Sequence, residues 1–506
     1  MYAFQSLIFL IFAPLIASLV IICPLFPTTD TIIRRFSKWF SIFHFLYAVS
    51  FLVLFQAKNP VIIIEDELKL FDISWIDTLG ISASFSIDSL SLVLVLLTTF
   101  IFFIAFVMSK RTIKKDFKLY YSFMFFLEMC ILGIFCAKDL FLFFLFWELE
   151  LVPMFFLISK WGSENAKKSA LKFLLYTFFG SIFILIGIFA LYFYNHSVSG
   201  VLTSNMDMIT TEPNLYSYPV LLFTFLCFLI GFGVKLPIVP FHTWLADAHS
   251  DAPTPVSIVL AAILLKTGAY GVLRINLGLF PEVFVILAPS LMFFAAVNCI
   301  YASFLAVVQK DIKRLIAFSS ISHMGIFLIG LFSLNYIGLS GAVFQLISHA
   351  FIAAGLFIIA GILYSLYSSR DITYIQNHLR NYPIFMFVSI PIILAAVGVP
   401  LFSGFIAEFL SFIGGFSAEY GIYYTKLLTA VCVFTVVLSS AYILKLFHSC
   451  FFGVKDFILT KDIGGHRLNI LIIISVIVFI FGIFPNILSD IYLPFIDTTV
   501  DILGVE

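Results

Sequence analysis

The sequence predicts an all-α protein that crosses a membrane about fourteen times, and three observations predict this fold class. The chain of 506 residues is 62% hydrophobic and 11% charged, whereas soluble domains have about 25% charged residues. Its mean hydropathy is +1.13. Apolar runs of about 17 to 25 residues, each long enough to span a bilayer, recur between polar breaks. Two of these runs are interrupted by glycine and proline, which predicts two inverted repeats.

The apolar runs give a provisional division of the chain. They begin near residues 4, 38, 87, 119, 140, 172, 218, 254, 283, 315, 340, 383, 427 and 468. Residues 1–118 are expected to hold helices 1 to 3 with an external loop, 119–278 the first five-helix repeat (helices 4 to 8), 279–452 the second repeat (helices 9 to 13), and 453–506 helix 14 with a tail. β-branched residues between about Val61 and Ser84 indicate an external hairpin.

The charged residues indicate an orientation and exclude some functions. Most of the 28 lysines and arginines fall in alternate loops, and the positive-inside rule places those loops on the cytoplasmic side, with both termini on the other side. The net charge is zero, so the composition implies no attraction to nucleic acid. The sequence has no nucleotide-binding, phosphate-binding or haem motif, so any redox chemistry is expected on another polypeptide.

The two interrupted helices occupy matching positions in the predicted repeats. Helix 7 contains Gly231 to Pro240 with Lys235 inside it, and helix 12 contains Gly398 to Glu408. Proline lacks a backbone donor and clashes with the preceding turn, so both helices are expected to break within the membrane. The broken helices are five positions apart in the chain, and because five is odd the two run in opposite directions, as in inverted-repeat transporters. Chance enrichment of glycine and proline in membrane helices is the alternative.

Several ionisable side chains lie within the apolar runs, where each costs about 2.5–3.5 kcal/mol to insert. They must therefore pair or line hydrated cavities. These residues are Glu128, Glu148, Glu150, Lys235, Lys266, His323, His349, Glu408 and Lys445.

Six of these residues form a candidate proton relay. Glu148 and Lys235 are the natural pair, because moving the carboxylate away would favour release of the ammonium proton. The proton is expected to pass next to Lys266 and then to two imidazoles that titrate near neutrality, with a carboxylate last before the opposite surface; these are His323, His349 and Glu408. A static buried ion pair is the alternative for Glu148 and Lys235. Glu128, Glu150 and Lys445 stay open between relay and structural roles.

Two further polar segments are expected to have structural roles or to line a hydrated site. His242 and His249 flank Trp244 beside helix 7, where a hydrated proton-uptake or capping role is favoured over a metal site, so we expect no metal ligands on the chain. Asp88 opens helix 3 and is expected to cap its N-terminus.

Seven segments distributed along the chain carry a family resemblance. They are Phe85–Leu90, Phe146–Pro153, Gly233–His249, Asp251–Pro255, Lys266–Gly271, Asp311–Gly325 and Ser403–Phe409. Together they resemble the antiporter-like membrane subunits of respiratory complex I, and within that family the bacterial chain M, which corresponds to chain 4 of the mitochondrial enzyme. Members have fourteen helices in the same inverted repeat. Two departures are Ser89, where glycine is common, and Ala246, where proline is common; neither removes a titrating group.

The resemblance assigns the candidate residues to roles. Glu148 and Lys235 are similar to the family's essential pair and Lys266 to its connecting lysine. His323 and His349 are similar to the family's central relay. Glu408 stands where sister chains usually carry lysine and chain M carries glutamate.

The resemblance also implies a function and a setting. It implies a proton-translocating subunit of NADH:quinone oxidoreductase, a translocase whose flavin, iron-sulfur clusters and quinone belong to partner subunits, with no cofactor on this chain. Implied partners are the lipid bilayer and other membrane-arm subunits, including sister antiporter-like chains. The expected location is the bacterial plasma membrane, with the mitochondrial inner membrane and the thylakoid as alternatives. Alternative functions are a subunit of a multi-chain sodium/proton antiporter, the membrane arm of an energy-converting hydrogenase, or a structural anchor without flux.

Overall fold

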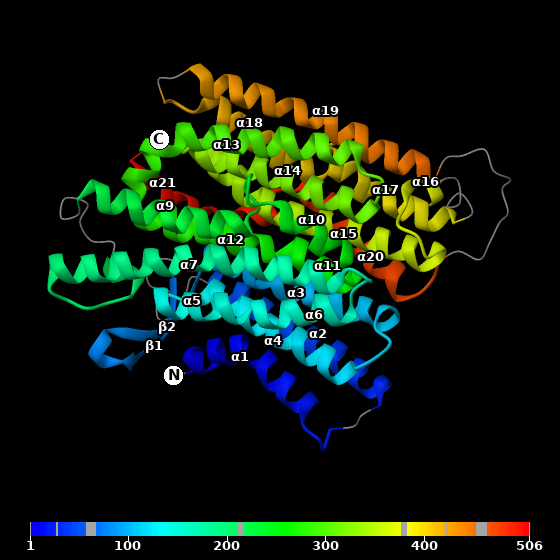
Figure 1. The fold of residues 1–506 in the computed structure, drawn as a ribbon, viewed down its shortest axis with the longest axis horizontal. Helices are drawn as coiled ribbons and strands as arrows, with labels where there is room; N and C mark the ends of the chain where they lie inside the picture. The colour runs from blue at the N-terminus through cyan, green and yellow to red at the C-terminus, as the bar shows by residue number, and fades with distance from the viewer. Residues whose placement is uncertain are drawn as a thin grey trace. The chain divides into compact units, whose positions relative to one another are not determined.

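The computed structural model describes residues 2–26, 29–56, 67–209, 217–375, 382–420, 423–451 and 463–504. The chain divides into two compact units. Unit 1 comprises Met1–Leu236 and Ile263–Ile286, and unit 2 comprises Pro237–Ala262 and Leu287–Glu506. Nearly all regular structure in both units is helical (Figure 1). The predicted all-α polytopic fold is confirmed.

Unit 1 contains the N-terminal helices and one β-hairpin. Its elements are α1 (Tyr2–Ile22), α2 (Asp30–Gln56), β1 (Glu67–Ile76), η1 (Asp77–Leu79), β2 (Ile81–Asp88), α3 (Ser89–Thr112), α4 (Phe117–Cys136), α5 (Leu140–Leu149), α6 (Leu151–Trp161), α7 (Ala166–Ser199), α8 (Met206–Ile209), α9 (Tyr218–Lys235), α12 (Leu265–Gly271) and the π-helical η4 (Val272–Leu277). The helix α13 (Pro281–Val308) begins in unit 1 and continues in unit 2.

The hairpin of unit 1 confirms the strand prediction for the described residues 67–88; residues 61–66 lie outside the described part. β1 and β2 pair antiparallel, from Glu67 opposite Asp88 to Ile76 opposite Ile81. The turn closes at Gly80, which has a left-handed φ of 60°. A Cβ at Gly80 would lie 1.8 Å from the carbonyl oxygen of Leu202, so only glycine fits there.

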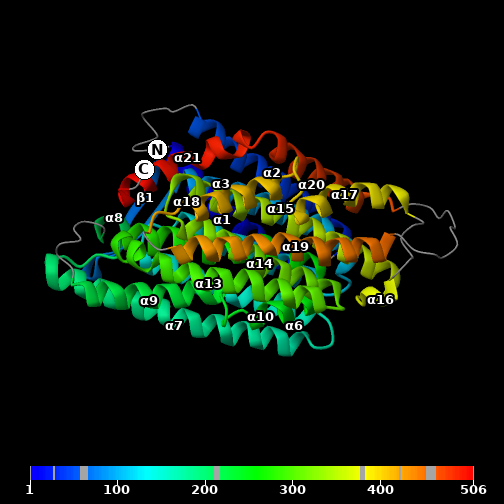
Figure 2. The same cartoon turned by 90° about the horizontal axis from the view of Figure 1, so that it is seen from above.

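Close helix packing in unit 1 depends on small residues. α7 and α9 run side by side (Figures 1 and 2). Where they are closest, a Cβ at Gly231 would lie 2.8 Å from the carbonyl oxygen of Gly180. Membrane helices associate through such small residues, because lipid supplies no hydrophobic force between helices. This contact fixes the position of the last turn of α9.

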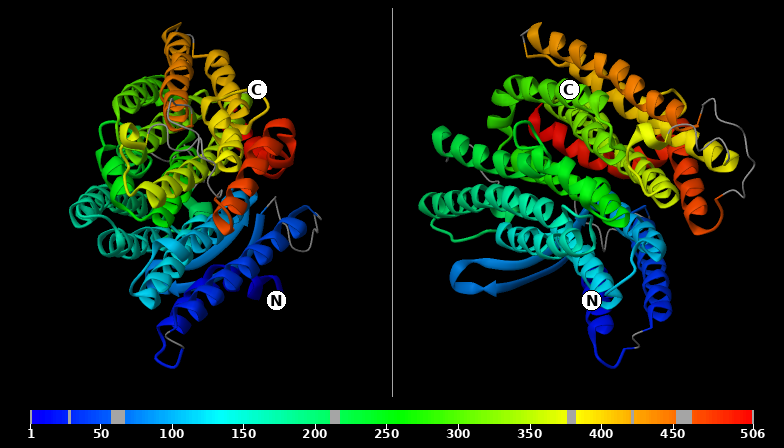
Figure 3. Two further views of the ribbon diagram at one scale, coloured as in Figure 1. Left: turned by 90° about the vertical axis from the view of Figure 1, so that its right-hand side faces the viewer. Right: turned by 45° about the vertical axis from the view of Figure 1, so that its right-hand side comes forward.

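Unit 2 is entirely helical in its described part. Its elements are α10 (Thr243–Asp251), α11 (Thr254–Val259), α14 (Ile312–Phe332), α15 (Tyr336–Tyr367), α16 (Ile372–Ile375), α17 (Pro383–Val397), α18 (Ser403–Ser417), α19 (Tyr423–Phe451), α20 (His466–Ile483) and α21 (Asn486–Leu503). The π-helical η3 (Leu260–Leu264) crosses the boundary between the units. The long α19, orange in Figure 3, packs beside the shorter α18.

The predicted helix breaks are present, and a third occurs that the sequence analysis did not predict. α9 ends at Lys235, before Pro237 and Pro240, and α17 ends at Val397, before Pro400. The additional break separates α5 from α6 at Glu150. Pro153 explains it, because proline has no N–H to bond the carbonyl of Leu149 and its ring clashes with that carbonyl.

The helix count agrees with the prediction over the described residues. Twelve helices are long and apolar enough to cross a membrane, and three shorter apolar ones lie at Leu7–Ile22, Pro383–Val397 and Ser403–Ser417. The last two are the halves of broken helix 12, so the spans number fourteen. Large apolar side chains such as Phe43, Phe387 and Leu427 are more than 60% exposed, as expected for surfaces that face lipid or neighbouring subunits. The tail forms one further helix, α21.

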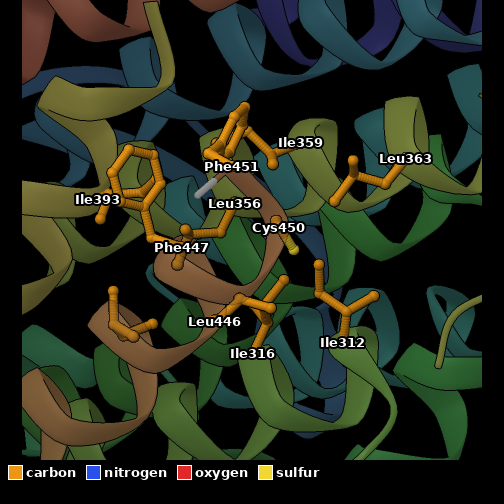
Figure 4. A pocket seen from close by; sticks show the side chains of 11 residues that line it. Ile312, Ile316, Leu356, Ile359, Leu363, Ile393, Leu446, Phe447, Cys450 and Phe451 are labelled. Carbon is orange, nitrogen blue, oxygen red and sulfur yellow. The ribbon is translucent and has the colours of Figure 1, made fainter. Parts of the chain in front are cut away.

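Unit 2 also has a small apolar pocket between α14, α15, α17 and α19. Isoleucine, leucine and phenylalanine side chains line it together with Cys450 (Figure 4). None of the ionisable candidates contributes to this lining, so their site lies elsewhere.

Candidate functional site

Lys235 is the last residue of α9 and is held inside unit 1. Its side chain is 1% exposed, and its Nζ forms an ion pair with Glu150 Oε1, which is 0% exposed. The ammonium also lies 3.6 Å from the centre of the Trp147 ring, a cation–π contact that strengthens where water is excluded. The Trp147 Nε1–H donates to Ser181 Oγ at 3.2 Å. The ring is therefore anchored to α7 beneath the lysine.

The two glutamates of the α5–α6 segment have different surroundings. Glu150 is fully buried against Lys235, whereas Glu148 is half-buried beside Ser181 and within electrostatic range of Lys235. The sequence analysis expected Glu148 to pair with Lys235, but the direct contact is made by Glu150. Residues two apart point to different faces of a helix, and sequence spacing does not show which face meets α9.

Lys266 lies on α12 in the same unit and is 0% exposed. Its helix packs directly on the end of α9 through two glycines. A Cβ at Gly268 would lie 2.8 Å from the backbone nitrogen of Leu236, and one at Gly271 would lie 2.6 Å from the Phe232 ring. The structure therefore brings the helices of Lys235 and Lys266 into backbone contact.

The remaining three candidates meet in unit 2. The rings of His323 on α14 and His349 on α15 have centroids 5.7 Å apart. His323 Nδ1 lies 3.5 Å from Glu408 Oε1 on α18, and the Gln345 amide nitrogen lies 3.4 Å from both Nδ1 and the carbonyl oxygen of His323. His323, His349 and Glu408 are 7%, 3% and 5% exposed. The three side chains form one buried cluster.

Glu408 lies against the break between α17 and α18. A Cβ at Gly398, which has a φ of 78°, would lie 2.4 Å from Glu408 Oε2. Glycine is needed both for this left-handed conformation and for the space that the carboxylate occupies. The second break thus positions Glu408 as the first positions Lys235.

Ion pairs surround the first turn of α14 in unit 2. Arg314 Nη1 lies 2.7 Å from Asp247 Oδ1, and Arg370 Nε lies 3.3 Å from Asp311 Oδ2. Beneath them, the buried Lys313 Nζ donates to the carbonyl oxygen of Ala252 at 2.7 Å. His249 is 0% exposed and its ring stacks on Phe357 at 4.8 Å. This cluster belongs to the basic side predicted to be cytoplasmic.

One buried pair includes a residue that sequence reasoning missed. His44 Nδ1 lies 2.9 Å from Glu128 Oε1, and His44 Nε2 lies 2.9 Å from the carbonyl oxygen of Leu10. Because a carbonyl only accepts, Nε2 carries a hydrogen and the remaining nitrogen faces the carboxyl group. Glu128, which the sequence left open between a relay and a structural role, is therefore held by a histidine of α2. A histidine inside an apolar run was the available signal.

The expected cap of α3 is confirmed. Asp88 Oδ1 accepts from the backbone N–H of Ser91 at 2.8 Å, and its other oxygen pairs with Arg274. Burial would raise the pKa of Asp88, but the Arg274 guanidinium and the Ser91 N–H hold it below its usual value. Asp88 is therefore a structural carboxylate that links α3 to η4.

The geometry allows proton exchange more readily than bond-making chemistry. Each unit buries carboxylates, amines or imidazoles at the end of a broken helix, and such groups accept and release protons. Among the described residues, no group of three or more His, Cys, Asp or Glu side chains is arranged to hold a metal ion.

Comparisons with known proteins agree with this arrangement. The family model described as "NADH:quinone oxidoreductase/Mrp antiporter, TM" matches residues 137–439. NADH-quinone oxidoreductase subunit M of Rickettsia prowazekii is 37% identical over 426 residues, covering 83% of this chain and 84% of that protein. Subunit M of Escherichia coli (strain K12) is 36% identical over 443 residues, covering 86% and 84%.

A solved structure extends the likeness to the whole chain. A chain of respiratory complex I from Thermus thermophilus with bound NADH superposes with a TM-score of 0.86 at 25% identity, covering 98% of this chain and 100% of that one. Over half of the chain matches the family model, and the relatives exceed 30% identity over most of its length. The chain therefore belongs to the family of NADH:quinone oxidoreductase and Mrp antiporter membrane subunits.

Proposed function

We propose that this chain is a proton-translocating membrane subunit of NADH:quinone oxidoreductase in a bacterial plasma membrane. Its relatives named subunit M support this choice of complex. Quinone reduction in other subunits supplies the driving force, and the flavin, iron-sulfur clusters and quinone belong to those subunits. Sister antiporter-like chains are the expected neighbours.

The observation that carries the proposal is the buried Lys235 at the end of α9, held by a carboxylate and an aromatic ring. An ammonium in this setting is stable only while its partner is near, because an uncompensated buried charge is strongly unfavourable. A displacement of the carboxylate therefore expels the proton. Movement in a neighbouring subunit needs to supply only that displacement.

The remaining relay residues receive the proton and pass it on. Glu148 and Lys235 change their proton occupancy when the carboxylate beside Lys235 is displaced, and Lys266 on the adjoining α12 takes the proton next. His323 and His349 relay it through unit 2, and Glu408 at the second break releases it. The close His323 to Glu408 approach supports the last step. In this scheme the inverted repeats 119–278 and 279–452 each supply one broken helix.

Replacement of Lys235 by alanine tests the proposal. Inverted membrane vesicles are assayed for NADH oxidation with an artificial acceptor, for quinone-linked NADH oxidation and for proton uptake. We expect Lys235→Ala to keep the artificial-acceptor reaction, which reports assembly, and to lose most quinone-linked oxidation and proton uptake. Lys114→Ala changes an exposed lysine and serves as the control. Unchanged proton uptake in an assembled Lys235→Ala complex would refute the proposal.

A further inference from the structure

Unit 1 contains one more buried carboxylate than a single Glu–Lys pair requires. The Lys235 ammonium contacts Glu150, and Glu148 lies within electrostatic range of the same ammonium. Among the described residues, neither oxygen of Glu150 has a hydrogen-bond partner apart from this ion pair. Glu150 is fully buried, and Glu148 is half-buried.

The backbone explains why both carboxylates reach one lysine. Pro153 interrupts the helix, so Glu150 stands at the junction of α5 and α6. Its N–H bonds the carbonyl oxygen of Phe146 at 3.2 Å, and its carbonyl accepts from Met154 at 3.3 Å. Trp147, three residues before Glu150, lies under the ammonium. Both are ordinary helical bonds, so the helical path continues through the junction, and Glu150 reaches α9 through its contact with Lys235.

The other buried charges of unit 1 have separate partners. Glu128 is bonded by His44. Asp139 accepts from Phe141, Leu142, Ser82 and Ser204 at the N-terminus of α5. The carboxylates that face Lys235 at the end of α9 are those of Glu148 and Glu150.

We propose that Glu150 is the counter-ion of Lys235 and that Glu148 is a separate proton-exchanging carboxylate, so the three groups can hold two protons at zero net charge. The proposal rests on the proton-translocating function proposed above. With Glu150 alone, the site would hold one proton, on Lys235, at zero net charge. With Glu148 as well, a second proton can be held on the Glu148 carboxyl group and the net charge is still zero. A proton can then enter at the half-buried Glu148 while Glu150 is still paired with Lys235, and a later displacement of Glu150 releases the Lys235 proton.

A charge-removal cycle identifies the counter-ion. Lys235→Met leaves its partner carboxylate buried without compensation, which lowers the ratio of folded to unfolded chain by about 10²-fold. The half-inactivation temperature of the purified complex, or the amount assembled if the single variant does not assemble, measures this loss. We expect Glu150→Gln to restore much of the loss in the double variant and Glu148→Gln to restore little. Restoration by Glu148→Gln instead, or by neither substitution, would overturn the proposal.

Proton uptake then tests the role of the second carboxylate. Glu148→Gln alone should keep the thermal stability of the complex and lower quinone-linked proton uptake by at least about tenfold, since a proton-transferring group contributes 10²- to 10⁴-fold. Glu164→Gln, at an exposed carboxylate after α6, is the control. Normal uptake in Glu148→Gln would overturn its exchanging role. If the Lys235→Met complex takes up protons normally, and Glu150→Gln still restores its stability, the proposed function is refuted while the assignment of Glu150 as the counter-ion stands.

Discussion

The contact between α7 and α9 predicts that a single methyl group will disturb Lys235. Gly231 lies one helical turn before Lys235, on the same face of α9. In Gly231→Ala, the new Cβ would lie 2.3 Å from Cγ1 of Ile184 and 2.8 Å from the carbonyl oxygen of Gly180. Ile184 can change its rotamer, but the Gly180 carbonyl belongs to the α7 backbone. The two helices must therefore separate.

The size of the effect follows from these distances. Favourable contacts between carbons lie at about 3.5–4.0 Å, so the Ile184 contact is short by more than about 1 Å. Overpacking of this kind costs about 1–3 kcal/mol. A misplacement of about 1 Å at a catalytic group can lower its rate by about 10²-fold. We expect the Gly231→Ala complex to assemble with lower thermal stability and to lose at least about tenfold in quinone-linked proton uptake.

Gly187→Ala provides the matched control for this prediction. Gly187 faces the same helix pair, but a Cβ there would lie 3.3 Å from the Phe228 ring and 3.4 Å from Cys227, which small side-chain shifts accommodate. Proton uptake by vesicles that carry the Gly187→Ala complex, divided by their rate of NADH oxidation with the artificial acceptor, should stay near the wild-type value. Equal uptake by the Gly231→Ala and Gly187→Ala complexes would refute the argument that this contact positions Lys235.

Three further substitutions test other contacts. Asp88→Asn removes the charge that pairs with Arg274 and should lower the stability of the folded chain by about 1.5–3 kcal/mol. The folded-state pKa of Asp88 lies below its usual value. This loss of stability should therefore be constant above about pH 5 and shrink as the pH falls through the lowered pKa. His44→Ala leaves Glu128 buried without its partner and should cost about 3 kcal/mol in thermal unfolding, more than Glu128→Gln, which keeps a hydrogen bond. Glu408→Gln removes the titratable carboxyl group beside His323 and should lower quinone-linked proton uptake by at least about tenfold with assembly retained.

Each of these predictions has a contradicting result. A stability difference for Asp88→Asn that grows on acidification would show that Asp88 is not charged in the folded chain. Greater loss from Glu128→Gln than from His44→Ala would contradict the pairing. Glu419→Gln, at an exposed carboxylate after α18, is the control for Glu408→Gln, and equal uptake by these two variants would remove Glu408 from the relay.

The sequence by itself determined the membrane fold, two of the helix breaks and most of the buried ionisable residues. Apolar run length sets the spans, because a bilayer of fixed thickness requires about 20 residues per helix. Proline and glycine set the breaks at Lys235 and Glu408, because they act on the backbone of their own turn. The cap at Asp88 was predictable for the same local reason.

Only the tertiary structure decided which buried side chains meet. The sequence favoured Glu148 as the partner of Lys235, but in the folded chain the direct contact is made by Glu150. His44 and Glu128 are 84 residues apart, so no local spacing predicts their contact. Pairing across helices depends on how each helix is rotated about its axis. Close glycine contacts such as Gly180 with Gly231 fix that rotation, and they arise only when distant helices pack.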